Sequence, residues 1–268
     1  MSDPSPDLFA GTAAFYARFR PGYPDEFLRH VIGRFGLDGT GRLLDLGCGT
    51  GQLALPLAPH VAEAIGLDPD PAMLAEAAAA ARRAGIRNAR WLVGSDRDLH
   101  RLSDEISSLH LATMGRSFHW MERDATLQSL GNLVDADGGI VIVSDEERVW
   151  AGRSDWHEAI RQTIHRWLGP QRRAGSSNYD VEHVPFDDTL AVSPFPRVEH
   201  YSITVSRSPS IDEIVGYLYS TSFCSPAVLG EKQAAFEADL RRTLSEYSPS
   251  GVLSESIDFD AWLAWRER

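Results

Sequence analysis

Short apolar runs alternate with amphipathic helical stretches along residues 40–145 of the chain. Each run is rich in Leu, Ile or Val and is bounded by glycine, proline or charged residues, which is typical of a strand buried in a parallel sheet. Strands are predicted at residues 42–46, 63–68, 90–93, 108–113 and 140–143. Because helical segments with short connections separate them, we expect a doubly wound parallel sheet.

Signals of helix boundaries support this alternation. Asp70-Pro71 is typical of a helix start, with the aspartate as N-cap, and Gly85 fits the C-cap of the same helix. Asp124 is expected to cap a second helix, and Asp137-Gly138-Gly139 predicts a turn into the fifth strand.

The flanking segments have a different pattern. Residues 7–35 indicate two helices interrupted at residues 20–24, where Arg, Pro, Gly and Tyr interrupt the helical pattern. Further helices are predicted at 154–168, 210–222 and 227–246, and a strand at 201–205. Residues 257–265 alternate between apolar and mostly polar side chains, so their period of two favours a closing strand.

Composition narrows the class of protein. The 268 residues include 26 basic and 38 acidic ones, which gives a formal net charge of -12, and Lys232 is the single lysine. This acidity argues against nucleic-acid binding, and the shortage of lysine excludes a Walker phosphate loop. No secretory signal or membrane-length apolar run is visible, and Cys48 and Cys224 fit neither a metal site nor a disulfide framework. We therefore expect a cytoplasmic protein with no membrane or nucleic-acid partner and no metal, of undetermined oligomeric state.

A glycine cluster, Gly47-Cys48-Gly49-Thr50-Gly51, lies between the first predicted strand and a helix, where open α/β sheets bind ligands. A nicotinamide fingerprint would place a small residue where Gln52 stands. Asp45 would repel a pyrophosphate but would favour a cofactor with a cationic amino group and a sulfonium. Asp68, at the end of the second strand, can accept hydrogen bonds from ribose hydroxyls. Asp96, after the third strand, can accept one from an adenine amino group.

These segments resemble a known family. Residues 43–51, Leu-Leu-Asp-Leu-Gly-Cys-Gly-Thr-Gly, look like motif I of class I S-adenosylmethionine-dependent methyltransferases, and residues 66–74 resemble the stretch after their second strand. Residues 16–24 and 117–121 resemble the type 11 subgroup of that family. Motif I is specific for the cofactor and says nothing about the acceptor. The resemblance therefore implies S-adenosylmethionine as the cofactor.

The resemblance also implies roles for individual residues. Asp45, Gly47 and Gly49 would hold the methionine part of the cofactor. Asp68 would hold the ribose, with Pro69 near the adenine.

Four more positions receive cofactor roles by the same resemblance. Gly94-Ser95-Asp96 departs from the commoner Gly-Asp-Ala order, so either Ser95 or Asp96 would contact the adenine. Residues 114–118, just after the fourth strand and beginning with Met114, would face the methyl donor. Tyr16 and Arg20, in an N-terminal lid, would close over the cofactor.

Residues of the acceptor site are open to two interpretations. His119 would suit the task of a general base, but Phe118, His119 and Trp120 would equally pack the loop and shape the pocket floor. Tyr217 and Tyr219, on a predicted cap helix, would contact the substrate or simply pack the core.

Together, the pattern and the resemblance predict a single domain with a Rossmann-like seven-stranded doubly wound sheet, mostly parallel with an antiparallel C-terminal strand, plus a helical cap. We expect a cofactor-binding core at 36–149, a cap at 150–196 and 208–250, and a lid at 1–35. The predicted activity is methyl transfer from S-adenosylmethionine to a small organic acceptor by in-line displacement. The alternatives are a protein that binds the cofactor or uses its sulfonium without transferring methyl, and a nicotinamide-dependent dehydrogenase.

Overall fold

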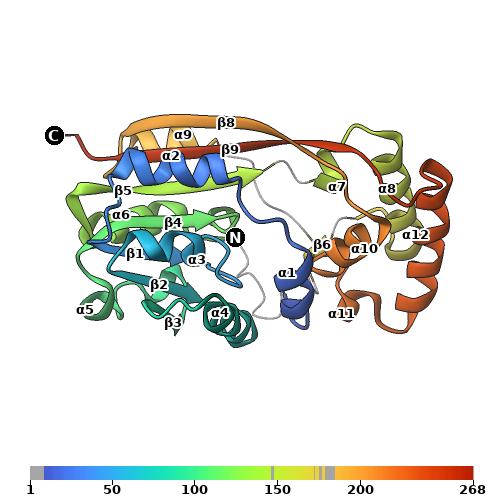
Figure 1. The fold of residues 1–268 in the computed structure, drawn as a ribbon, viewed down its shortest axis with the longest axis horizontal. Coiled ribbons are helices and arrows are strands. Elements are labelled where there is room, and N and C mark those ends of the chain that lie inside the picture. Colours follow the sequence, from blue (N-terminus) through green and yellow to red (C-terminus); the bar gives the residue numbers. More distant parts are fainter. Residues whose placement is uncertain (1–8, 146–147, 172, 175–176, 179–184, 268) are drawn as a thin grey trace. The chain divides into compact units, whose positions relative to one another are not determined.

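The computed structural model describes residues 9–145, 148–171, 173–174, 177–178 and 185–267 (Figure 1). A seven-stranded sheet has the order β3-β2-β1-β4-β5-β9-β8, and β6 and β7 form a separate pair. The strands are β1 Arg42–Leu46, β2 Glu63–Asp68, β3 Ala89–Val93, β4 Leu109–Gly115, β5 Val134–Asp145, β6 Arg173–Ala174, β7 Ser177–Asn178, β8 Arg197–Arg207 and β9 Glu255–Trp265. Strands β3, β2, β1, β4 and β5 are parallel, and β9 is antiparallel to β5. The predicted sheet, with its antiparallel C-terminal strand, is confirmed.

The chain divides into two compact units. Unit 1 comprises Met1–Pro21, Asp145–Asp180 and Ile203–Phe259, and unit 2 comprises Gly22–Ser144, Val181–Ser202 and Asp260–Arg268. The predicted boundaries of core, lid and cap stay a prediction. Residues 1–8 of that lid and residues 172, 175–176 and 179–184 of that cap lie outside the described residues.

Helices accompany both units. Those of unit 2 are α2 Asp25–Phe35, α3 Ala54–Leu57, η1 Ala58–His60, α4 Pro71–Ala84, η2 Asp96–Asp98, α5 Ser103–Ile106, η3 Phe118–Trp120, α6 Arg123–Leu133 and α9 Phe186–Ala191. Those of unit 1 are α1 Ala13–Phe19, α7 Arg148–Ala151, α8 Asp155–Leu168, α10 Ile211–Tyr219, α11 Pro226–Leu229, η4 Gly230–Lys232 and α12 Gln233–Tyr247. Within the described residues, no helix is long and apolar enough to cross a membrane.

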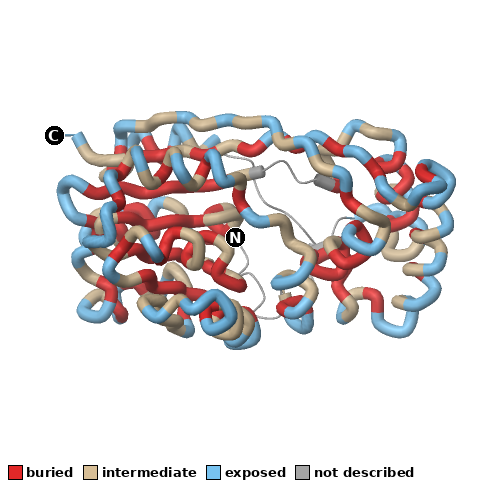
Figure 2. Tube along the Cα trace, in the orientation of Figure 1, coloured by how far each residue is buried: buried red, intermediate tan, exposed pale blue. Residues whose placement is uncertain are grey.

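The core of unit 2 lies on the central strands, which are buried along most of their length (Figure 2). Leu44 of β1, Ile65 of β2 and Ile142 of β5 belong to one apolar cluster, together with Leu127 and Leu130 of α6. These strands carry apolar residues at consecutive positions because helices cover both faces of a doubly wound sheet.

The start of α6 departs from the prediction. The helix begins at Arg123, and Asp124 lies in its first turn rather than at its N-cap. Asp96 supplies the acceptor instead: its Oδ2 accepts hydrogen bonds from the Glu122 backbone N at 3.1 Å and the Thr126 hydroxyl at 3.3 Å. The predicted cap is wrong because a distant carboxylate satisfies the donors of this helix end.

The predicted turn at residues 137–139 lies within β5, at a shift of its register with β4: Leu109 pairs with Val134 and Leu111 with Gly139. A Cβ on Gly138 would stand 2.4 Å from the carbonyl oxygen of His110, and one on Gly139 would stand 2.3 Å from the ring of Phe35. These glycines therefore permit close packing against a neighbouring strand and a helix.

Unit 1 is a helical assembly with a core of its own. Ile160 and Ile164 of α8 and Leu240 and Leu244 of α12 share one buried cluster. A Cβ on Gly216 of α10 would lie 2.3 Å from the ring of Phe19 at the end of α1, so only glycine allows these helices to approach so closely. Ser210 and Glu213 cap α10 reciprocally in a capping box.

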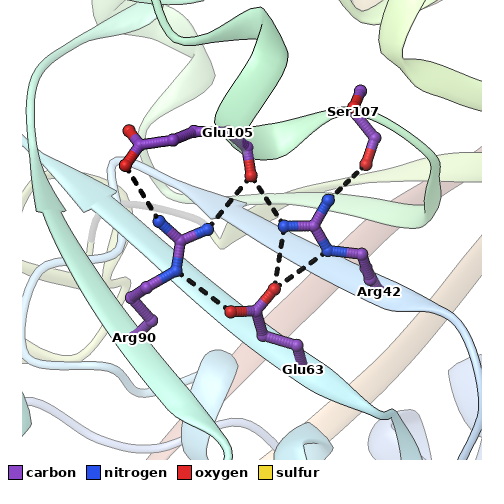
Figure 3. Close-up of polar contacts among 5 residues, drawn as sticks. All are labelled: Arg42, Glu63, Arg90, Glu105 and Ser107. Atoms are coloured by element: carbon purple, nitrogen blue, oxygen red, sulfur yellow. Dashed lines mark hydrogen bonds and ion pairs between the residues drawn. The ribbon is translucent and has the colours of Figure 1, made fainter.

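An ion-pair network joins the amino ends of β1, β2 and β3 (Figure 3). Glu63 accepts hydrogen bonds from Nε of Arg42 at 2.9 Å and Nε of Arg90 at 3.0 Å. Both guanidinium groups also donate to the backbone carbonyl of Glu105, at 2.7 and 3.1 Å, and Arg42 donates to that of Ser107. Burial acts to raise the pKa of Glu63, but the hydrogen bonds from the two arginines outweigh it and hold the pKa below its usual range.

We expect Glu63→Gln to lower the free energy of unfolding by about 1–2 kcal/mol, because both ion pairs are lost from a partly exposed site. The deficit should shrink as the pH falls through the lowered pKa of Glu63, since the parent carboxylate then protonates. Urea titrations at several pH values measure it. Glu76→Gln on α4 is the control, and an equal loss in that variant would contradict the role of the network.

Candidate functional site

The glycine cluster forms a turn at the carboxyl end of β1. Gly47, Gly49 and Gly51 all have positive φ, at 68°, 51° and 81°, which other residues adopt only with strain. A Cβ on Gly47 would lie 2.6 Å from Cβ of Ser117, and the Ser117 hydroxyl donates to the carbonyl of Leu46 at 2.7 Å. The loop after β4 is therefore packed directly onto the glycine turn.

Asp45 lies just before this turn and is almost fully buried. Its Oδ2 accepts from the Ala54 backbone N at 3.1 Å, and its Oδ1 accepts from the hydroxyl of Thr113 at 2.9 Å. Thr113 reaches it because the two residues are partners in the register of β1 with β4. Burial raises the pKa of Asp45 to about 7, although both hydrogen bonds act to lower it.

Asp68 ends β2 on the other side of the glycine turn. Its Oδ2 accepts from the Gly49 backbone N at 2.8 Å and its Oδ1 from the Asp70 backbone N at 2.9 Å. Burial raises the pKa of this carboxyl as well. A carboxylate has about four acceptor positions, so both aspartates retain capacity for donors of a ligand.

Residues after β3 have structural partners. Ser95 and Asp98 cap η2 reciprocally, with the Ser95 backbone N donating to Asp98 at 2.9 Å. The Asp96 Oδ2 is the acceptor for the start of α6 described above. Pro69 is exposed, and so is Val93, an apolar residue at the end of β3.

The loop after β4 carries the predicted catalytic residue. His119 is partly exposed, with its ring centre 4.7 Å from that of Trp120. Phe118 is 1% exposed and packs against Phe186 at 5.4 Å, and Met114 is wholly buried. A side chain held in the core is unsuited to line an open pocket, so burial supports the packing interpretation for Phe118 and leaves only the backbone of Met114 for a ligand.

Tyr23 and Arg116 also belong to this edge, and the sequence singled out their segments without giving either residue a role of its own. Arg116 has a φ of 59°, a strained value for a residue with a side chain, and its guanidinium lies 4.8 Å from the ring centre of Tyr23. The Tyr23 hydroxyl comes so close to Gly115 that a Cβ there would lie 2.2 Å from it. Thr113 was missed, because its role depends on strand register, whereas Ser117 was singled out only as part of its segment.

In unit 1 the structure brings three predicted residues together. The guanidinium of Arg20 lies 4.9 Å from the ring centres of both Tyr16 and Tyr217, and its Nε donates to the Ser220 hydroxyl at 3.0 Å. Tyr219 is buried elsewhere in the core. Its hydroxyl donates to Glu237 at 2.7 Å, and burial together with this bond raises its pKa, which supports core packing over substrate contact.

Comparisons with known proteins identify the family. Residues 43–138 match the family described as "Methyltransferase domain", and this stretch holds the whole glycine turn with Asp45 and Asp68. These residues form a methyltransferase domain of the class I, S-adenosylmethionine-dependent type. The type 11 subgroup stays a prediction, and the nicotinamide alternative is set aside.

Individual relatives of this methyltransferase agree with that assignment. CRG1 of Saccharomyces cerevisiae, named a probable S-adenosylmethionine-dependent methyltransferase, is 29% identical over 128 residues, which are 47% of this chain and 43% of that protein. RlmD of Aeromonas salmonicida, a 23S rRNA (uracil(1939)-C(5))-methyltransferase, is 36% identical over 95 residues, 35% of this chain and 20% of that protein. The chain therefore matches less than half the length of either relative.

A solved structure shows the same fold. A protein from Anaeromyxobacter dehalogenans described as a type II methyltransferase is 20% identical, with a TM-score of 0.65, and the match covers 92% of this chain and 98% of that one.

The raised pKa of Asp45 predicts that the ligand-free methyltransferase becomes less stable as the pH rises. Between the unfolded pKa of about 4 and the folded pKa of about 7, the unfolded state binds fewer protons, so stability falls as pH rises and levels off above that range. The side chain of Asp45→Asn does not ionise. From pH 4 to pH 7 the free energy of unfolding of the parent should therefore fall by on the order of a few kcal/mol relative to that of this variant. Thermal unfolding from pH 4 to 8 measures the difference, and parallel curves would contradict the buried charge.

Proposed function

We propose that this methyltransferase transfers a methyl group from S-adenosylmethionine to a small organic acceptor by in-line displacement. The observation that carries the proposal is the pair of buried carboxylates, Asp45 and Asp68, on either side of a positive-φ glycine turn. The cofactor supplies a methyl group on a cationic sulfonium, and the protein's main task is to align the acceptor with it.

The residues present fit the cofactor. Gly47 and Gly49 turn the backbone through positive φ at the carboxyl end of β1, and the carboxylates suit a cationic amino group and ribose hydroxyls. We infer that Asp45, Gly47 and Gly49 hold the amino-acid part and that Asp68 holds the ribose, with Pro69 near the adenine.

Further cofactor contacts are proposed at the edge of the adenine and in the lid. Ser95 and Asp96 both stay proposed for the adenine edge, and each also has partners in the protein, Ser95 in η2 and Asp96 at the start of α6. Tyr16 and Arg20 stay proposed lid residues, and their stacked arrangement in unit 1 supports a shared role.

A small acceptor is favoured over nucleic acid by charge. The chain carries a net charge of -12, whereas binding to phosphate backbones depends on lysine and arginine faces. The match to RlmD, which acts on RNA, is confined to a segment of 95 residues. A cytoplasmic location and the absence of a membrane partner are part of the same proposal.

His119 is the proposed general base, and Trp120 and Tyr217 are the proposed acceptor contacts. The partial exposure of His119 beside the loop after β4 supports this role, since a base must reach the proton of the bound acceptor. An acceptor oxygen or nitrogen would lose its proton to the imidazole as its bond to the methyl carbon forms and the methyl–sulfonium bond breaks, with S-adenosylhomocysteine as the leaving group.

The cofactor site predicts selective binding. Calorimetric titration should show that S-adenosylhomocysteine binds and NAD does not. Asp68→Asn should weaken binding roughly 10- to 100-fold, because charge-assisted hydrogen bonds are lost. Asp104→Asn, an exposed change on α5, is the control. Unchanged affinity in a folded Asp68→Asn variant would overturn the ribose role, and tighter binding of NAD would overturn the cofactor.

The proposed role of His119 as general base predicts that its removal lowers turnover. Once a panel of small acceptors shows release of S-adenosylhomocysteine, His119→Ala should lower kcat about 100-fold or more and remove the acidic limb of the pH profile, while His100→Ala should leave both unchanged. Full turnover in His119→Ala would remove the base. Cofactor binding without release for any acceptor would favour a protein that does not transfer methyl.

A further inference from the structure

The indole of Trp91, at the centre of β3, lies against the backbone of β2. Trp91 and Gly66 are partners in the register of the two strands, and a Cβ on Gly66 would stand 2.4 Å from Cε3 of the indole. The φ of Gly66 is not in the left-handed region, so it is space rather than backbone conformation that requires glycine here. The absence of a side chain at Gly66 therefore allows the indole to lie across β2.

The far end of the same indole contacts the glycine turn. A Cβ on Gly51 would stand 2.8 Å from Cη2 of Trp91 and 3.1 Å from Cγ of Leu55, so both side chains pack on the last residue of the turn. The Gly51 carbonyl accepts from the Leu55 backbone N at 2.9 Å. Trp91 thus contacts the turn at the point where the chain leaves it for α3.

The first residues of the turn are held by different contacts. The backbone N of Gly47 and that of Cys48 both donate to the carbonyl of Leu67 on β2, at 2.8 and 3.1 Å. The Cys48 side chain packs on β2 as well, since a Cβ on Gly66 would lie 2.8 Å from its Sγ. Hydrogen bonds therefore fix the start of the turn to β2, whereas Gly51 meets the sheet through the indole.

A turn that contains three positive-φ glycines needs contacts from outside it to keep one conformation, because glycine has the largest backbone freedom. An indole has few rotatable bonds and fills its space at close packing, so its removal leaves room into which the turn can move. Binding groups that are fixed before the ligand arrives lose less conformational entropy on binding. The packing of the indole on Gly51 therefore bears on the affinity of the turn for its ligand.

We propose that Trp91 is a positioning residue for S-adenosylmethionine, whose indole holds Gly51, and with it the glycine turn, in the conformation that binds the cofactor. The inference rests on the proposed cofactor site at Asp45, Gly47 and Gly49, and it assigns no contact between the indole and the cofactor. All of these residues belong to unit 2. Cofactor affinity then depends on a side chain of the third strand that lies outside the cofactor's own contacts.

Trp91→Leu tests this role in the full-length protein by two measurements. The shorter side chain does not reach Gly51 as the indole does, so calorimetric titration should show that S-adenosylhomocysteine binds about tenfold more weakly. Hydrogen–deuterium exchange of the ligand-free variant should be faster than in the parent at residues 47–55 and unchanged in β5. A merely structural role would accelerate exchange in both segments, because it acts through global stability.

Trp265→Leu is the matched control, since Trp265 is a partly exposed tryptophan of β9 in the same unit, with its ring centre 3.5 Å from the guanidinium of Arg34. This variant should keep the parent's affinity and its exchange at residues 47–55. Parent-like affinity or exchange in a folded Trp91→Leu variant overturns the proposal, and so does an equal loss of affinity in the control.

A second variant decides if Trp91→Leu does not fold. Trp91→Phe keeps a ring over Gly66 but is too short to contact Gly51 as the indole does, so it should also weaken S-adenosylhomocysteine and speed exchange in the turn. Parent-like values for both would overturn the proposal. Failure of the parent itself to bind S-adenosylhomocysteine would overturn the cofactor site together with this role, whereas equal binding by parent and variants overturns the role of Trp91 alone.

Discussion

The arrangement of unit 2 depends on two buried carboxylates. Asp45 and Asp68 end adjacent parallel strands, and each satisfies backbone N–H groups that the glycine turn and the following helices leave without partners. Burial without those hydrogen bonds would be prohibitive. The donors therefore have to stay in place, which keeps the glycine turn in its positive-φ conformation and positions both carboxylates toward the same edge of the sheet.

The opposite edge of the sheet is arranged differently. There the charged groups are opposite in sign and pair among themselves, so Arg42, Glu63 and Arg90 tie three strands together with little uncompensated charge. At the carboxyl edge the acidic groups accept from backbone N–H groups and the Thr113 hydroxyl, without a cationic partner in these contacts, and keep acceptor positions for a ligand. The charged groups are thus paired with one another at the amino ends of the strands, whereas the carboxylates at the carboxyl ends can accept hydrogen bonds from cationic groups.

Local signals predicted the fold well, and contacts between distant residues account for the errors. The helix after Asp70 was predicted from its cap and from Gly85, and both are confirmed, because each acts within a few residues. The start of α6 was mispredicted because its acceptor, Asp96, lies in a different connection. At the site, residue types around the glycine turn were readable in sequence, whereas Thr113 depends on strand register. Tyr219 is likewise held by a partner on another helix, Glu237, that no spacing rule reveals.

Strand β9 has a consequence for how the protein is made. Its first half places Ile257 and Phe259 in buried positions of unit 1, and its second half places Leu263 and Ala264 in buried positions of unit 2. Neither unit can complete its buried interior until this strand has left the ribosome, although β1 and β2 are synthesised some two hundred residues earlier. Contacts of such long sequence separation form slowly. Until β9 is synthesised, the nascent chain therefore carries two unfinished cores, and this one strand completes both.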